Sequence, residues 1–167
     1  MHFYDQATIE VRAGNGGDGL VSFFRNKSVA KGGPDGGDGG DGGSIIFVAT
    51  TRENTLTDFV RQKKFVAESG QQGGRQRSHG KSGEDLLLAA PVGTLVYKVS
   101  SKGEKELLAD LSEDSAQVIV VRGGKGGFGN AHFTSSPRQT PKFAEFGSPG
   151  DGLTLHLELK LVADVAI

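Results

Sequence analysis

Residues 32–43 read GGPDGGDGGDGG, and this stretch decides the fold more than any other part of the chain. Its glycines recur at every third position, at Gly33, Gly36, Gly39 and Gly42. A second run, GGKGGFG, has the same spacing at Gly123, Gly126 and Gly129. Three residues per turn is the period of the polyproline II helix, whose backbone amides must find partners outside the helix. The spacing therefore predicts a bundle of such helices, packed closely through these glycines.

The other glycines follow the same segregated distribution. The chain has 27 glycines in 167 residues, and all but Gly93 and Gly103 fall in five short clusters. A flexible tether is the alternative, since ordering each glycine costs about 0.5–1 kcal/mol relative to alanine. Tethers are usually padded with serine, however, whereas these clusters carry Arg, Lys, Asp and Pro. We therefore favour an ordered structure.

The segments between the glycine clusters are short and rich in β-branched and aromatic residues, as strands are. The expected strands are residues 8–11, 20–24, 44–50, 65–67, 86–90, 94–99, 117–121 and 153–162. Turns are expected at 91–94 and 101–103, and only residues 58–64 suggest a helix. The fold class is therefore all-β: a small antiparallel barrel or sandwich with glycine-rich extensions. Closure into a barrel would remove the sheet edges.

Composition limits the class of protein. The length suits one compact domain, and the absence of cysteine excludes disulfides and thiolate metal sites. No apolar run reaches the roughly 18 residues of a membrane span, and the first residues lack the pattern of a signal peptide. We therefore expect a cytoplasmic protein. The last residues, VADVAI, are apolar and strand-like up to Ile167, which suggests a cut through a longer protein; a buried last strand is the alternative.

The distribution of charge is more informative than the net charge of −1. Ten of the 19 cations lie in three segments that contain no acid. Residues 25–34 hold Arg25, Lys27 and Lys31; residues 70–83 hold Arg75, Arg77 and Lys81; residues 121–144 hold Arg122, Lys125, Arg138 and Lys142. Such segments favour an anionic partner, although chance clustering is the alternative.

Two nucleotide-binding motifs are tempting but incomplete. GNGGDG at 14–19 satisfies GxGxxG, yet a strand rather than the required helix is expected after it. Gly74 and the GKS at 80–82 resemble a P-loop, but five residues instead of four separate the glycines, and no helix is expected to follow. We interpret Lys81 as a surface cation. No catalytic pairing of nucleophile and base can be identified.

Metal binding is also disfavoured. Asp35, Asp38 and Asp41 lack the nine-residue period of calcium-binding repeats, and we expect them to cap backbone amides or to pair with loop cations. The four histidines show no metal-ligand spacing. No metal site is therefore expected within these residues.

With catalytic and metal sites disfavoured, the sequence is most consistent with a protein that binds nucleic acid. Exposed amides of glycine-rich loops suit phosphate oxygens, and Arg and Lys supply the electrostatic attraction to nucleic acid. Phe128, His132 and Phe133 are candidates for stacking on unpaired bases, although packing against the barrel is the favoured role of the phenylalanines. RNA is preferred to DNA, since no recognition helix is expected.

Four stretches of this sequence resemble the Obg family of ribosome-associated GTP-binding proteins. They are VSFFRNKSVAKGGPDGGDGGDGGSI, GKSGEDLLLAAPVGTLVY, VRGGKGGFGNAHFTSSPRQTPKFAEFGSPGDG and LELKLVADVAI. The resemblance covers residues 3–167, and the motifs are specific in combination. Phe24, Asn26 and Ala30 depart from it, since the family more often has Arg, Glu and Pro there.

The resemblance implies the Obg fold, a small barrel carrying a bundle of polyproline II helices with three loops at one end. It implies an Obg domain over residues 1–158 and the start of a Ras-like GTPase domain at 159–167. The whole protein would hydrolyse GTP with Mg²⁺ and act in large ribosomal subunit assembly and in stress and growth control. No GTP, Mg²⁺ or catalytic site is expected within this chain.

The same resemblance places the family's ribosome-binding loops on the acid-free segments. The first two loops carry the cations named above, and the third covers residues 136–142 with Arg138, Gln139 and Lys142. The implied partner is the large ribosomal subunit and its RNA, bound by a monomer without a membrane span. A structural or protein-interaction domain with solvated charges is the alternative. The RNA-binding hypothesis predicts an affinity that falls steeply with salt, since phosphate contacts release counterions, and the alternative does not.

Overall fold

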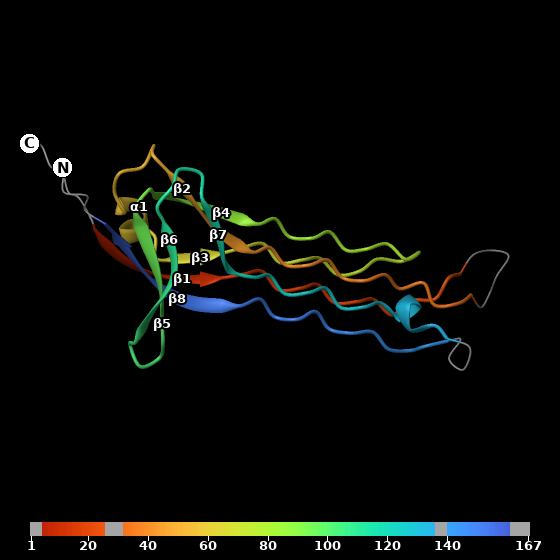
Figure 1. Ribbon diagram of the computed structural model, residues 1–167. Helices are drawn as coiled ribbons and strands as arrows, with labels where there is room; N and C mark the ends of the chain where they lie inside the picture. Colours follow the sequence, from red (N-terminus) through yellow and green to blue (C-terminus); the bar gives the residue numbers. More distant parts are fainter. Residues whose placement is uncertain (1–4, 26–31, 136–139, 161–167) are drawn as a thin grey trace, which may run out of the picture.

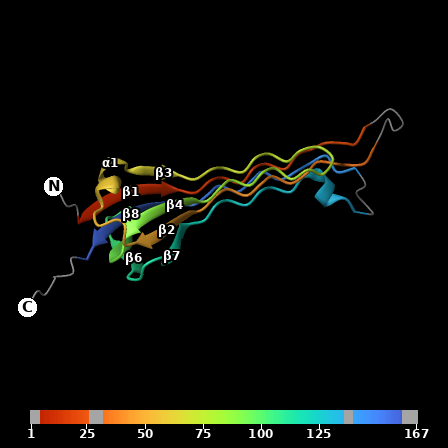
Figure 2. The same cartoon turned by 90° about the horizontal axis from the view of Figure 1, so that it is seen from above.

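The computed structural model describes residues 5–25, 32–135 and 140–160. The strands are β1 (Gln6–Arg12), β2 (Ile45–Thr50), β3 (Lys64–Val66), β4 (Leu86–Pro91), β5 (Thr94–Val99), β6 (Lys105–Leu111), β7 (Gln117–Val121) and β8 (Gly152–Leu159). The helices are α1 (Thr57–Arg61) and the 3₁₀ helix η1 (Asn130–Phe133). Strands and α1 gather at one end of an elongated molecule, here called the β body (Figure 1). The glycine arm, residues 13–25, 32–44, 67–85, 122–135 and 140–151, extends from it (Figure 2).

The strands form two sheets. One has the order β3-β1-β8-β5-β6 and the other the order β4-β2-β7. Alternation of apolar and polar residues explains why β1 is a strand with one buried face, because Ala7, Ile9 and Val11 are buried and the residues between them are exposed. In β8 apolar and polar residues also alternate, and Leu155 and Leu157 are both fully buried, although His156 between them is buried as well.

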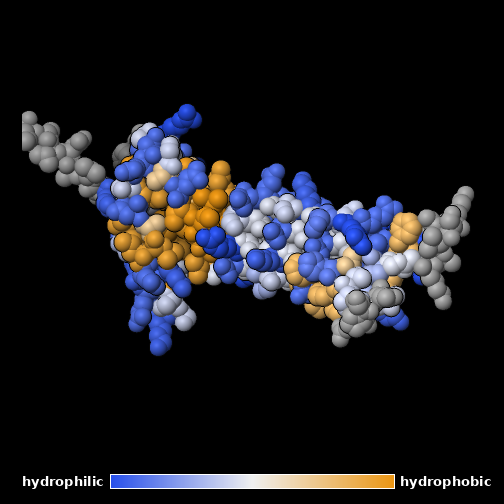
Figure 3. All heavy atoms as spheres, turned by 45° about the vertical axis from the view of Figure 1, so that its right-hand side comes forward, coloured by the Kyte–Doolittle hydropathy of each residue, from blue (hydrophilic) through white to orange (hydrophobic). Residues whose placement is uncertain are grey.

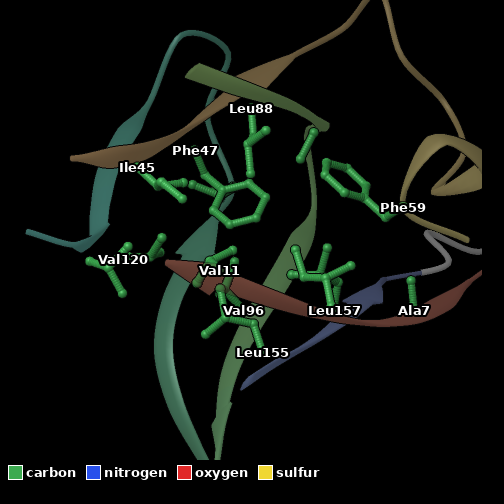
Figure 4. Packing of buried hydrophobic residues seen from close by; sticks show 14 of the residues in the cluster. Ala7, Val11, Ile45, Phe47, Phe59, Leu88, Val96, Val120, Leu155 and Leu157 are labelled. Carbon is green, nitrogen blue, oxygen red and sulfur yellow. The ribbon is translucent and has the colours of Figure 1, made fainter. Parts of the chain in front are cut away.

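The hydrophobic core lies between the two sheets (Figure 4). Val96, Leu155 and Leu157 from the five-stranded sheet join Phe47 and Leu88 from the three-stranded sheet. Helix α1 closes one side, since its Phe59 packs against Phe47 with ring centroids 5.7 Å apart. This core anchors the base of the arm.

The expectation of antiparallel sheets is wrong, because both sheets are mixed. β1 pairs with β3 in parallel, and so does β2 with β4. The arm explains this: β1, β3 and β7 lead into it, whereas β2, β4 and β8 follow it. Two strands that both lead outward are necessarily parallel when they pair, and an outgoing strand next to a returning one is antiparallel, as in β1 with β8. The arm excursions thus serve as the crossover connections that parallel pairing requires.

Two further expectations need correction, and one strand was not predicted. The sheets do not close into a barrel, so β3, β6, β4 and β7 are edges. Residues 20–24 form no strand and contribute only an isolated bridge between Phe23 and Pro34, because they belong to the arm. Strand β6 was not expected, since only Leu111 of its seven residues is buried and the strand is held as an edge on β5.

The other expected strands, the all-β class and both turns are confirmed, except that the strand expected over 153–162 ends at Leu159 and residues 161–162 lie outside the described residues. Gly93 and Gly103 lie in the β4–β5 and β5–β6 turns with φ of 97° and 83°. That left-handed conformation disfavours side chains, which explains these two glycines outside the clusters. The helix expected within 58–64 is confirmed as α1, displaced to Thr57–Arg61.

Candidate nucleic-acid interface

Backbone hydrogen bonds join the segments of the glycine arm at every third residue. The amides of Gly14, Gly17 and Leu20 donate to the carbonyls of Gly43, Gly40 and Gly37 over 2.8, 2.8 and 3.1 Å. The amides of Gly37, Gly40 and Gly43 donate in turn to Gly74, Gln71 and Glu68. One residue in three therefore faces each neighbouring segment, and the register of the whole arm is set by this pairing.

The glycines expected to be structural lie mostly where backbones meet. A Cβ added at Gly36, Gly39 or Gly42 would overlap the carbonyl oxygen of Leu20, Gly17 or Gly14. A Cβ at Gly129, Gly126 or Gly123 would overlap the carbonyls of Gly36, Gly39 or Gly42. Gly33 differs, because no atom lies within 4 Å of its added Cβ. Gly33 thus belongs to the threefold pattern of the sequence, but no neighbouring backbone packs against it.

Acidic side chains of the arm accept hydrogen bonds from amides that face them. Asp38 Oδ1 accepts from Gly129 N at 2.7 Å, and Asp41 Oδ1 accepts from Gly126 N at 2.8 Å. On another side Asp18 Oδ1 accepts from Gly147 N at 2.8 Å. Of the two roles expected for Asp38 and Asp41, capping of amides or pairing with loop cations, the structure shows capping of amides. Their negative charge is therefore directed partly into the arm rather than toward solvent.

A strained turn presents two of the candidate cations. Between Arg75 and Arg77 the chain reverses, with φ of 56° at Gln76 and 58° at Arg77, a conformation that non-glycine residues rarely adopt. Asp35 holds it: the carbonyl of Asp35 accepts from Arg77 N at 2.7 Å, and Asp35 Oδ2 accepts from Gln76 N at 3.2 Å. Asp35 is only 7% exposed. Sequence reasoning gave it no part in positioning the cations.

The candidate cations that the structure describes all point to solvent. Arg25, Arg75, Arg77, Lys81, Lys125 and Lys142 are exposed. Within the described part of the chain, none of them forms an ion pair, whereas Lys64, Lys105 and Lys160 of the β body pair with acids. The remaining candidates, Lys27, Lys31, Arg138 and Gln139, lie outside the described residues.

The described cations lie at different places on the arm. Arg25 and Arg75 line one hollow of about 400 Å³ at the outer end of the arm, together with residues 20–24 and Asp35. Arg77 lies beside it and lines a second hollow with His79 and His132. Lys125 lines a groove nearer the β body with Asp41 and Ser82. Lys81 and Lys142 line none of these three hollows.

The aromatic residues singled out from the sequence lie on the arm. Phe128 and His132 stack with ring centroids 3.7 Å apart and planes 3° from parallel. Phe133 packs against Phe143 at 4.8 Å. The expectation that the phenylalanines pack against the barrel is wrong, because η1 and the neighbouring segment of the arm hold them far from the sheets.

One residue that sequence reasoning missed is Asn130. It is fully buried at the start of η1, and its side chain bonds residues of three other arm segments. The only sequence signal is an asparagine directly after GGFG, which does not reveal partners so far away in the chain. Asn130 therefore positions the aromatic residues next to it.

Neither incomplete nucleotide motif has the geometry that it would need. Residues 20–25, which follow GNGGDG, run along the arm and form no helix. Ser82 of the GKS sequence accepts a hydrogen bond from Asp41 N at 3.2 Å, and the residues after it lead into β4. Among the described residues, no group of three or more His, Asp or Glu side chains is arranged to hold a metal ion. The same residues contain no helix of the length and apolar character needed to cross a bilayer.

Comparison with known proteins now identifies the family. The family model described as GTP1/OBG matches residues 4–161. The chain belongs to the GTP1/OBG family. It is 49% identical over 167 residues to a GTPase Obg of Nitratidesulfovibrio vulgaris, covering all of this chain and 46% of the relative. It is 52% identical over 165 residues to the GTPase Obg of Caldicellulosiruptor saccharolyticus, covering 99% of this chain and 38% of the relative. This GTP1/OBG chain thus spans less than half the length of these relatives.

Proposed function

We propose that this chain is the ribosome-binding part of an Obg-type GTPase, and that the outer end of its glycine arm binds RNA of the large ribosomal subunit. One observation carries the proposal: exposed cations of the arm form no ion pairs with described residues, while nearby aspartates bond backbone amides. This arrangement favours phosphate groups, which dominate affinity for nucleic acid. Three cations, Arg25, Arg75 and Arg77, converge there from two arm segments.

The proposal extends to the longer protein. The relatives are named GTPase Obg, so we infer that the whole protein hydrolyses GTP with Mg²⁺ through a domain that begins near residue 159. We further propose that the whole protein acts as a cytoplasmic monomer in assembly of the large subunit and in stress and growth control. The arm segments, with hydrogen bonds every third residue, are proposed to be polyproline II helices, a rigid support for the binding end.

Cosedimentation of the chain with purified large subunits across a salt series tests the proposal. Replacing Arg25, Arg75 and Arg77 together with alanine removes three phosphate contacts, so the slope of log affinity against log salt should fall by about 2–3. The matched control replaces Lys63, Lys98 and Lys102, exposed lysines of the β body, which changes the net charge equally. Circular dichroism establishes that both variants fold.

The alternative function is a rigid spacer or protein-interaction domain whose charges are merely solvated. It predicts equal affinity and equal salt slopes for the wild-type chain and both triple variants. Equal slopes from well-folded proteins would therefore reject RNA binding by this end of the arm. A loss shared by both triple variants would indicate nonspecific attraction instead.

A further inference from the structure

Five aromatic residues gather along one part of the glycine arm, here called the aromatic patch: Phe128, His132, Phe133, Phe143 and Phe146. The first four are linked by ring contacts of 3.7–6.2 Å between centroids. Phe146 directly follows Glu145, whose amide donates to the carbonyl of Phe128 at 2.9 Å, so Phe146 lies next to the same segment. The patch therefore joins η1 to the segment that returns to β8.

The aromatic patch is exposed to a degree that folding does not explain. Phe146 is 86% exposed, Phe143 42% and Phe128 40%. Burying a phenylalanine is among the largest single gains available to a folding chain, yet none of these phenylalanines belongs to the hydrophobic core. Large aromatic side chains held at the surface of a monomer indicate a binding site.

The stacked pair offers a ready geometry. Phe128 and His132 lie parallel within 3° at 3.7 Å, the arrangement that two stacked bases adopt, and the side chain of His132 is 50% exposed. Asp38 helps to fix the pair, because its Oδ1 binds Gly129 N at 2.7 Å while its Oδ2 lies 3.9 Å from His132 Nδ1. A flat ligand can extend this stack without rearrangement of the protein.

The surroundings of the patch select the chemistry of the ligand. Lys125 and Lys142 are close to it in sequence and exposed, and neither pairs with an acid among the described residues. The acid nearest in sequence, Glu145, accepts a hydrogen bond from Phe128 N at 3.1 Å. On the face of the arm that Figure 3 shows, the apolar groups are small and hydrophilic surface lies around them, unlike the continuous apolar core of a protein interface. Aromatic faces interleaved with cations are typical of sites for single-stranded nucleic acid.

We propose that the aromatic patch stacks unpaired bases of RNA, with Phe146 and the Phe128–His132 pair as the stacking faces and Lys125 and Lys142 beside the phosphates. The bases must be unpaired because a duplex covers their faces with neighbouring base pairs. This inference rests on the proposed RNA binding. It adds that the aromatic patch contacts single-stranded parts of the RNA.

The test measures binding of a short single-stranded RNA that carries one 2-aminopurine, whose fluorescence is quenched by stacking, and of the same RNA in a duplex. Phe146→Ala and Phe128→Leu should each weaken single-strand binding by about fivefold or more and reduce the quenching, since stacking contributes strongly per base. Phe146→Trp should retain both. Leu87→Ala is the matched control, since Leu87 is 60% exposed on β4, away from the arm.

Several outcomes would overturn the proposal. Equal affinity and equal quenching for Phe146→Ala, Phe128→Leu and the wild-type chain would do so. So would weaker binding of these variants to large subunits with unchanged binding to the RNA, because the patch would then contact protein. A wild-type chain that binds large subunits but not the single strand rejects the patch alone, whereas one that binds neither also rejects the proposed function.

Discussion

Asn130 Oδ1 accepts a hydrogen bond from the amide of Gly36 at 2.8 Å, in the interior of the glycine arm. The same oxygen accepts from Ser22 N at 3.3 Å, while Nδ2 donates to the carbonyls of Ser22 and Pro141, each at 3.0 Å. All four hydrogen-bonding positions of the amide are therefore filled by backbone groups of three other segments. One side chain thus fastens together the outer end of the arm.

Replacement of Asn130 with alanine should lower the free energy of unfolding by about 3 kcal/mol or more, because several buried backbone groups lose their partner. Asn130→Asp should be similarly destabilising, since a carboxylate cannot donate to the carbonyls of Ser22 and Pro141. Asn15→Ala is the control: Asn15 is exposed and accepts one bond from Gly150 N, so we expect about 1 kcal/mol. Urea denaturation measures all three, and equal losses for Asn15→Ala and Asn130→Ala would contradict this account.

Glycine substitutions should show whether a glycine is required by a neighbouring backbone or merely shares the threefold spacing. Gly39→Ala places a methyl group onto the carbonyl of Gly17, so we expect a loss of about 1–3 kcal/mol or more as the backbones move apart. Gly33→Ala meets open space and no positive φ, so its effect should stay within about 0.5 kcal/mol. Thermal midpoints compare the two variants. If both are unchanged, the arm is a loose tether after all.

Removal of the Asp35 side chain should loosen the turn that carries Arg75 and Arg77. Asp35→Ala leaves the amide of Gln76 without its acceptor, so hydrogen exchange at Gln76 should become faster and stability should fall by about 1–3 kcal/mol. Asp41→Ala removes the acceptor of Gly126 N instead, on another face of the arm, and should leave exchange at Gln76 unchanged. Unchanged exchange in Asp35→Ala would mean that the backbone alone holds the turn.

The chain by itself should not bind GTP. Its only GKS sequence lies in an arm segment, where Ser82 Oγ is engaged by Asp41 N and no helix begins. A phosphate-binding loop needs the amides of a helix start, so titration with a fluorescent GTP analogue and Mg²⁺ should give no saturable signal. Saturation at micromolar concentration would contradict the prediction, and a known GTPase serves as the positive control.

The sequence predicted features that depend on local patterns. Runs of residues typical of strands identify β1 and β8, and the threefold glycine spacing indicates close packing of backbones, correctly at Gly36 and Gly39. The parallel pairing of β1 with β3 was missed because it depends on which strands lead into the arm, a property of the whole chain. The role of Asn130 was missed for the same reason, since it follows from the register between remote segments.

Pairing at every third residue has a consequence for how such a chain can change in length. One extra residue within any arm segment would move each later amide, aspartate and glycine off its partner, for example Asp38 and Asp41 off Gly129 and Gly126. Three extra residues would restore the match, but only if the segments alongside gained three as well. The distance between the sheets and the outer end of the arm is therefore adjustable only in whole triplets, added to all neighbouring segments together.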